Sequence, residues 1–128
     1  MQTTVIKKTL LFALLVVTGS AWAEWLKIGN IDSATFYIDP ATVRKDGNFR
    51  KVWEIIDLKT RHKNGELSYR MRMEYDCKEE RDRILSVTSH SQAMASGKEL
   101  TSVIGNGQWN DIPPDSNSET TLKIVCAK

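Results

Sequence analysis

Apolar and polar residues alternate through the middle of the chain, and this period of two predicts β-strands. The clearest example is "LSYRMRMEYDC", residues 67–77. We expect one row of its side chains to face a core: Leu67, Tyr69, Met71, Met73, Tyr75 and Cys77. We expect the other row to face solvent: Ser68, Arg70, Arg72, Glu74 and Asp76. Cys77 therefore points inward at the end of a strand.

Other segments with β-forming residues predict the rest of a sheet. They are residues 24–29, 34–39, 48–59 and 83–94, with a short strand or turn around 100–104. Residues 48–59 carry apolar side chains on both faces, which indicates a central strand. Asp46-Gly47 and Asn64-Gly65 are turn signals, and the second should join the central strand to residues 67–77 as an antiparallel pair. We expect Pro40 to end its strand, with a single turn as one interpretation of residues 40–44.

The C-terminal tail changes to a helical period. Ser116 or Ser118 can cap a helix, and Leu122, Val125 and Cys126 then share one face. Several β-branched residues leave a final strand as the alternative. We favour a helix packed on the Met-Tyr face of the sheet, which would bring Cys126 to Cys77. The predicted fold is α+β, with a single antiparallel sheet of about five to six strands and a C-terminal helix on one face.

The start of the chain has the pattern of a signal peptide. Lys7 and Lys8 precede an apolar run at residues 10–17, and Ala21-Trp22-Ala23 is typical of a cleavage site. The run is too short for a spanning helix of about 20 residues. We therefore expect a signal peptide at residues 1–23 and a single exported domain at residues 24–128, with no transmembrane span after cleavage. The expected location is the periplasm, the cell surface or the medium.

Export changes the interpretation of the cysteines and of the charge. In an oxidising compartment, the lone pair Cys77 and Cys126 predicts a disulfide. In the chain-entropy model, closing a loop of about 50 residues stabilises the folded domain by about 4 kcal/mol.

Loss of Lys7 and Lys8 reduces the number of basic residues from 18 to 16, which equals the number of acidic residues. A neutral domain gives no support for nucleic-acid binding, which favours a strongly basic one.

An ordered set of residues resembles the surface-adhesin protein E family of Gram-negative bacteria. Its carriers are Trp25, Tyr37-Ile38-Asp39, Val52-Trp53, Asp76-Cys77, Trp109 before Ile112-Pro113, and Val125-Cys126. The resemblance implies a curved antiparallel sheet, a C-terminal helix tied by one disulfide, and, in some members, a surface protein that binds host matrix and serum proteins. One departure is that no lipidation cysteine follows the apolar run at residues 10–17.

Candidate catalytic and metal-binding residues are few. Met71 and Met73 could ligate Cu(I), although core filling is the usual role of methionine at inward positions. His90 is the one candidate for a hydrolase, but no nucleophile motif accompanies it. Basic clusters at residues 44–51 and 59–63 are expected to be solvated ends of turns. We therefore expect no enzyme, no catalytic or metal site, and no cofactor.

The polar row of the sheet is the candidate binding surface. Arg70, Arg72 and Glu74 lie on it, and Trp109 in the loop of residues 105–116 could anchor a protein partner. The predicted function is protein binding, with a host extracellular or an envelope protein as partner. A periplasmic envelope protein, or a small-ligand or metal carrier that uses Met71 and Met73, is the alternative. An exposed edge strand favours a homodimer.

Overall fold

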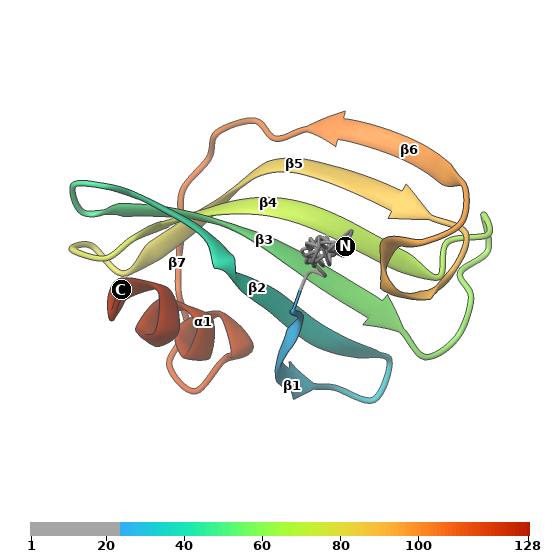
Figure 1. Cartoon of the computed structure of the whole chain (residues 1–128), viewed down its shortest axis with the longest axis horizontal. Coiled ribbons are helices and arrows are strands. Elements are labelled where there is room, and N and C mark those ends of the chain that lie inside the picture. Colours follow the sequence, from blue (N-terminus) through green and yellow to red (C-terminus); the bar gives the residue numbers. More distant parts are fainter. Residues whose placement is uncertain (1–23) are drawn as a thin grey trace, which may run out of the picture.

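A computed structural model describes residues 24–128, and the predicted signal peptide at residues 1–23 lies outside the described part. The chain forms one open antiparallel sheet with a helix against one face (Figure 1). The strands are β1 Leu26–Asn30, β2 Ala34–Asp46, β3 Phe49–Leu58, β4 Ser68–Asp76, β5 Arg81–His90, β6 Glu99–Ile104 and β7 Asn110–Asp111. A 3₁₀ turn, η1 Ala93–Ala95, follows β5, and the helix is α1 Asn117–Cys126. The predicted α+β fold is confirmed.

The strands lie side by side in the order β1-β2-β3-β4-β5-β6, and the two-residue β7 pairs with β5. This order arises because each of these strands pairs antiparallel with the next one along the chain, through connections that range from the tight β2–β3 turn to the longer β3–β4 loop. Gly47 adopts a positive φ of 55° in the β2–β3 turn, as a tight hairpin requires. The long strands bend along their length, which gives the sheet its curvature (Figure 1).

Strand β2 does not end at Pro40, so that prediction was wrong. The ladder between β2 and β3 is interrupted between Asp39 and Arg44, and Pro40 lies in this irregular stretch, where a missing N–H costs nothing. Side chains supply the lost hydrogen bonds. The Thr42 hydroxyl accepts from the Trp53 N–H at 3.0 Å and donates to the Asp39 carbonyl at 2.7 Å. The strand therefore bends at Pro40 and continues.

The pairing of β3 with β4 decides which side chains share a face. Val52 lies opposite Met73, and Trp53 lies opposite Arg72. The face that carries α1, here the helix face, includes Val52, Glu54 and Ile56 of β3 and Met71, Met73 and Tyr75 of β4. The opposite face, here the open face, includes Trp53 and Ile55 of β3 and Arg70, Arg72 and Glu74 of β4.

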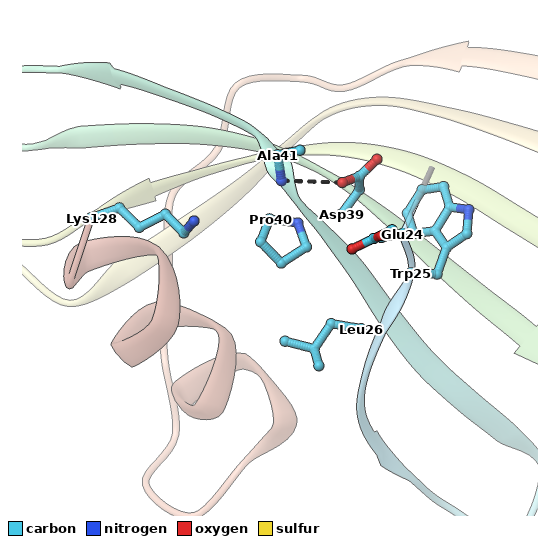
Figure 2. A pocket seen from close by; sticks show the side chains of 7 residues that line it. All are labelled: Glu24, Trp25, Leu26, Asp39, Pro40, Ala41 and Lys128. Carbon is cyan, nitrogen blue, oxygen red and sulfur yellow. Dashed lines mark hydrogen bonds between the residues drawn. The ribbon is translucent and has the colours of Figure 1, made fainter. Parts of the chain in front are cut away.

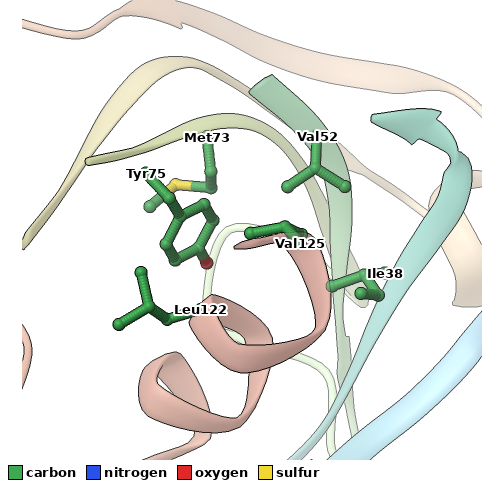
Figure 3. Close-up of a cluster of buried hydrophobic side chains, with 6 residues drawn as sticks. All are labelled: Ile38, Val52, Met73, Tyr75, Leu122 and Val125. Atoms are coloured by element: carbon green, nitrogen blue, oxygen red, sulfur yellow. The ribbon is translucent and has the colours of Figure 1, made fainter. Parts of the chain in front are cut away.

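The core lies between the helix face and α1. Six buried side chains form it: Ile38, Val52, Met73, Tyr75, Leu122 and Val125 (Figure 3). Val125 is fully buried, and Ile38, Val52 and Tyr75 are at most 1% exposed. The predicted inward positions of Met73 and Tyr75, and the predicted apolar face of the helix, are confirmed. Ile112, after β7, also packs against this cluster.

The C-terminal tail is a helix, as favoured over a final strand, and it begins after Ser116, one of the two predicted caps. The Ser116 hydroxyl accepts from the Glu119 N–H at 3.1 Å and caps the first turn. Only Thr121, Leu122 and Val125 of α1 are buried, so the helix has a small contact with the sheet. Cys126 at its last residue forms the predicted disulfide with Cys77, and the Cα atoms are 5.8 Å apart.

Replacing Cys77 or Cys126 by serine should lower the free energy of unfolding by about 4 kcal/mol, because the bond closes a loop of 49 residues. For a domain of this size, that loss corresponds to a melting temperature lower by about 15 °C or more. Thermal unfolding followed by circular dichroism measures it. The double variant is the control and should have the same melting temperature as the single variants, since all three lose the same bond. A single variant that melts with the wild type would contradict the role of the disulfide.

Candidate functional site

The middle of the open face carries a tryptophan between two arginines. The guanidinium carbon of Arg70 lies 4.1 Å from the centroid of the Trp53 ring, and that of Arg72 lies 5.5 Å from it. Both arginines come from β4, which is paired to the strand of Trp53. Each contact is a cation–π interaction, which holds a long flexible side chain in place.

One end of the open face is covered by η1. The Ser68 hydroxyl donates to the Gln92 carbonyl at 2.6 Å and accepts from the Ala95 N–H at 2.8 Å. The Asp57 carboxylate accepts from the Met94 N–H at 2.8 Å. Met94 and Ala95 both have positive φ, at 55° and 57°, so side-chain hydrogen bonds from the sheet hold a strained turn in place. Ser68 is fully buried as a result.

Two ion pairs occupy the other end of the open face. Arg83 donates to the Glu74 carboxylate with Nε at 2.8 Å, and Arg81 donates to Asp76 at 3.0 Å. Both carboxylates are buried, with Glu74 5% and Asp76 3% exposed. Burial opposes ionisation of Asp76, but N–H groups of Glu79 and Lys78 and the Arg81 guanidinium hold its pKa below the usual value.

Trp109 covers these ion pairs. Its ring centroid lies 4.3 Å from the guanidinium carbon of Arg83, 4.8 Å from that of Arg81 and 5.7 Å from the ring of Phe49. β7 follows at once and pairs with β5, and Ile112 then packs into the core on the helix face. The segment from Trp109 to Ile112 thus wraps around the edge of β5 and places one apolar side chain on each face.

The prediction that the polar row faces solvent was therefore correct for Arg70 and wrong for Ser68, Glu74 and Asp76. All five residues lie on the open face, as their spacing predicts. The turn η1 and the Trp109 segment bury the two ends of the row, however, and leave only its middle accessible. Glu74 is thus a structural partner of Arg83, and Arg70 and Arg72 are the accessible part of the predicted surface.

The accessible middle is hollowed beside Trp53. A cavity of about 220 Å³ lies between Trp25 and Trp53 and is also bordered by Asp39, Arg70 and Met94. Within residues 24–128, the ion pairs are those of Arg81, Arg83 and Lys123, so Arg70 and Arg72 have no carboxylate partner. The hollow itself carries one cation, Arg70, and one carboxylate, Asp39, and Arg72 adds a second cation beside the Trp53 ring. The unpaired positive charge of the two arginines suits a partner side chain that carries negative charge.

A second hollow, of about 440 Å³, lies where the first and last described residues come together. Figure 2 shows Glu24 and Leu26 directed toward Pro40 of β2 and Lys128 beyond α1, while the Trp25 ring lies on the other side of the backbone, near Asp39. The Asp39 carboxylate turns back to accept from the Ala41 N–H at 3.1 Å. Trp25 and Asp39 also border the hollow beside Trp53. The two hollows are therefore neighbours that share one wall.

A third cavity, of about 250 Å³, opens on the helix face beside the first turn of α1. Most of its wall area is apolar, and its polar groups come from Glu54, from Tyr75 and from the start of α1 (Asn117, Ser118 and Thr121). The Tyr75 hydroxyl donates to Glu54 Oε2 at 2.5 Å. Burial raises the pKa of Glu54 to about 7, with a smaller contribution from the nearby Asp82 carboxylate. Burial also raises the pKa of Asp82, which hydrogen-bonds with Ser118.

The predicted chemical candidates are separated by the fold. Met71 and Met73 line the cavity on the helix face, and Met94, the third methionine of residues 24–128, lies on the open face and cannot join them as a ligand. His90 is buried, and its Nε2 atom lies 2.8 Å from the Thr88 hydroxyl. Among the described residues, no carboxylate is hydrogen-bonded to His90.

The basic cluster at residues 44–51 is not wholly solvated. Arg50 is only 6% exposed and donates to the carbonyls of Gly47, Phe49 and Lys128. It holds the β2–β3 turn against the end of the chain, so its role is structural.

In residues 24–128, no helix has the length and apolar character to cross a membrane.

Sequence reasoning missed Trp53, Arg81, Arg83 and Trp25 as parts of this surface. Trp53 shares a face of β3 with Phe49, and that spacing was visible in the sequence. Its contact with Arg70 and Arg72 depends on the register between β3 and β4, which the sequence signals did not specify. Arg81 lies before the predicted strand of residues 83–94, whereas β5 begins at Arg81. Arg83 lies at the start of the predicted strand, but its pairing with Glu74 depends on the register between β4 and β5.

Comparison with known proteins identifies the family. The fold resembles that of Haemophilus influenzae protein E: its crystal form II shares 15% identity and a TM-score of 0.62, over 72% of this chain and 80% of that chain. The protein from non-typeable Haemophilus influenzae shares 14% identity and a TM-score of 0.61, over 83% of this chain and 77% of that one. At such identities the likeness shows the fold alone. No curated protein matches the sequence. The family described as Surface-adhesin protein E matches residues 25–127, and the chain therefore belongs to the surface-adhesin protein E family.

Proposed function

We propose that this chain is an exported, non-enzymatic binding protein that captures a protein partner with the middle of its open face. The observation that carries the proposal is the stack of Arg70 and Arg72 on Trp53, with no carboxylate partner for either arginine among the described residues. Membership of an adhesin family supports a binding role over a catalytic one.

The physical reasons are pre-organisation and unmatched charge. Tryptophan and arginine are enriched among the residues that dominate binding energy at protein interfaces. Stacking on Trp53 fixes the two guanidinium groups before a partner arrives, which lowers the entropy lost on binding. Their unpaired charge would be matched by aspartate or glutamate side chains, which guanidinium groups bind in a bidentate manner. We therefore infer an acidic patch on the partner.

The hollow beside Trp53 gives the surface a point of insertion. Its volume of about 220 Å³ is suited to one side chain, and its walls include two indole rings, the Arg70 guanidinium and the Asp39 carboxylate. The strained Met94 backbone forms part of the wall, and strain of this kind is concentrated at binding sites. An acidic side chain next to an aromatic or aliphatic one on the partner would fit both the hollow and the arginines.

The edge of the sheet offers a separate contact. Strand β6 is exposed along its whole length, with Val103 57% and Ile104 79% exposed, so its outer edge could pair with a second copy of this chain. The homodimer stays a prediction. Self-association at β6 would leave the open face available, because strands that pair at an edge extend the sheet without covering it.

The double variant Arg70→Gln with Arg72→Gln should weaken capture of a partner by about tenfold or more, because truncation at an interface centre costs more than about 1 kcal/mol for each such residue. The measurement is biolayer interferometry against a panel of purified matrix and serum proteins. Light scattering of the same samples separates capture from self-association.

Lys123→Ala is the matched control, since Lys123 is an exposed cation on α1, away from the open face. It should bind with the affinity of the wild type. If the glutamine double variant and the wild type bind every panel member equally, the open face is not the binding surface.

We further propose that the open face is displayed outside the cell. Protease treatment of intact cells should then remove the protein, and periplasmic extracts of the same cells should contain little of it. The control is a soluble periplasmic protein, which should survive the treatment. If the protein survives with that control and is recovered from the periplasm, host binding fails and an envelope partner replaces it.

A further inference from the structure

We propose that the cavity on the helix face is a second binding site, for a small molecule that joins an apolar chain to a protonated amine. The site is independent of the proposed protein capture, because it lies on the opposite face of the sheet. The inference rests on two features of the cavity, its apolar walls and the sign of the charge at its floor.

The walls are formed by side chains from four strands. Phe36 of β2, Ile56 of β3, and Met71 and Met73 of β4 face the cavity, and the half-exposed Ile84 of β5 lies at its rim. Methionine fills irregular space and adapts to different apolar shapes, which is why it is common in sites for flexible ligands. The volume of about 250 Å³ lies below the usual range of drug-sized sites, about 300–1,000 Å³, so the ligand must be small.

The floor is acidic. Glu54 presents its carboxyl group to the cavity, with the Tyr75 hydroxyl bonded to Oε2 at 2.5 Å. The interaction of Asp82 with Glu54 places a second carboxyl group near the first. No lysine, arginine or histidine lines the cavity. A cation with an apolar tail matches this arrangement, because a protonated amine can donate to Glu54 while its chain contacts the methionines.

The groups around Glu54 determine how the site responds to pH. β4 contributes Tyr75 and β5 contributes Asp82, while β2 and α1 present only uncharged side chains to the cavity. Arg50 lies four residues before Glu54 on the same face of β3, and its guanidinium group donates to three backbone carbonyls. With a pKa of about 7, Glu54 is mostly protonated at pH 6 and mostly ionised at pH 8. Affinity for an amine should therefore rise from pH 6 to pH 8.

The first turn of α1 favours a different ligand and provides the rival hypothesis. A helix N-terminus attracts anions, and Asn117 and Ser118 border the cavity. In this helix, however, the Ser116 hydroxyl already accepts from the Glu119 N–H, and the Glu119 carboxylate lies in the first turn. These groups offset the positive end of the helix, so we expect the Glu54 carboxyl group, with Asp82 near it, to decide the charge of the ligand.

The test compares three probes of one chain length, n-octylamine, n-octanol and n-octanoate, by isothermal titration calorimetry with the purified exported protein at pH 8. Octylamine should bind about tenfold tighter than octanol, because a charge-assisted hydrogen bond is added to the same apolar contact. Octanoate should bind more weakly than octanol. Octylamine affinity should fall severalfold when the pH is lowered to 6, whereas octanol affinity should stay constant.

Methyl NMR of the methionines locates the probe. Signals of Met71 and Met73 should shift with octylamine, and the signal of Met94, on the open face, should not. Glu54→Gln should keep octanol binding and the Tyr75 hydrogen bond but lose both the preference for the amine and its pH dependence. The Arg70→Gln, Arg72→Gln double variant should bind octylamine as the wild type does.

The proposal is overturned by octanoate binding tighter than octylamine, by shifts at Met94 without shifts at Met71 and Met73, or by absence of binding of all three probes. Equal affinity for octylamine and octanol in the wild type would also overturn it. These wild-type measurements decide the question even if Glu54→Gln does not fold. None of them depends on the capture of a protein partner, so the two proposals can fail separately.

Discussion

The disulfide between Cys77 and Cys126 is the constraint on which the rest of the structure depends. The helix has ten residues and buries only three of them, and isolated helices of this length are marginal in water. The covalent bond joins its last residue to the turn after β4, so Leu122 and Val125 stay against Tyr75, Met73 and Val52. If the helix detached, this core would be open to solvent, and the cavity beside the first helical turn would lose one wall.

The open face is held in a different way, by polar contacts at its two ends. The backbone of η1 is fixed by the side chains of Ser68 and Asp57, and the Trp109 segment covers the buried ion pairs of Glu74 and Asp76. Removing one partner of a buried ion pair leaves the other charge buried without a partner, which makes such contacts costly to break. The residues at both ends of the open face therefore have structural roles. The stack of Arg70 and Arg72 on Trp53 lies between them as the part that is free to meet another molecule.

Much of the fold could be predicted from the sequence because its signals are local. Alternation at residues 67–77 predicted the two faces of β4, turn residues predicted the hairpins, and Ser116 predicted the start of the helix. The register between strands and the burial of a side chain by a distant segment are not set by local sequence. A two-residue turn at Asn64-Gly65 would place Trp53 opposite Asp76, whereas the longer loop places it opposite Arg72. Burial of Glu74 depends on Trp109, which is distant in sequence, and so the polar row was read as solvated. Pro40 was read as a strand end because the side-chain hydrogen bonds of Thr42 and Asp39 that replace the ladder are formed only in the folded chain.

Strand β3 links the two proposed sites. Trp53 and Glu54 are consecutive residues, and in a strand their side chains point to opposite faces. Trp53 therefore belongs to the cationic open face, and Glu54 to the acidic cavity on the helix face. A slip of one residue in β3 would place the carboxyl group beside Arg70 and the indole in the core, so neither site survives a change of register. The hydrogen bond from the Trp53 N–H to Thr42 and the fit of Val52 against Val125 oppose such a slip from the two faces. One short stretch of sequence can thus keep opposite charges on the two sides of a single sheet, with the backbone of β3 as the barrier between them.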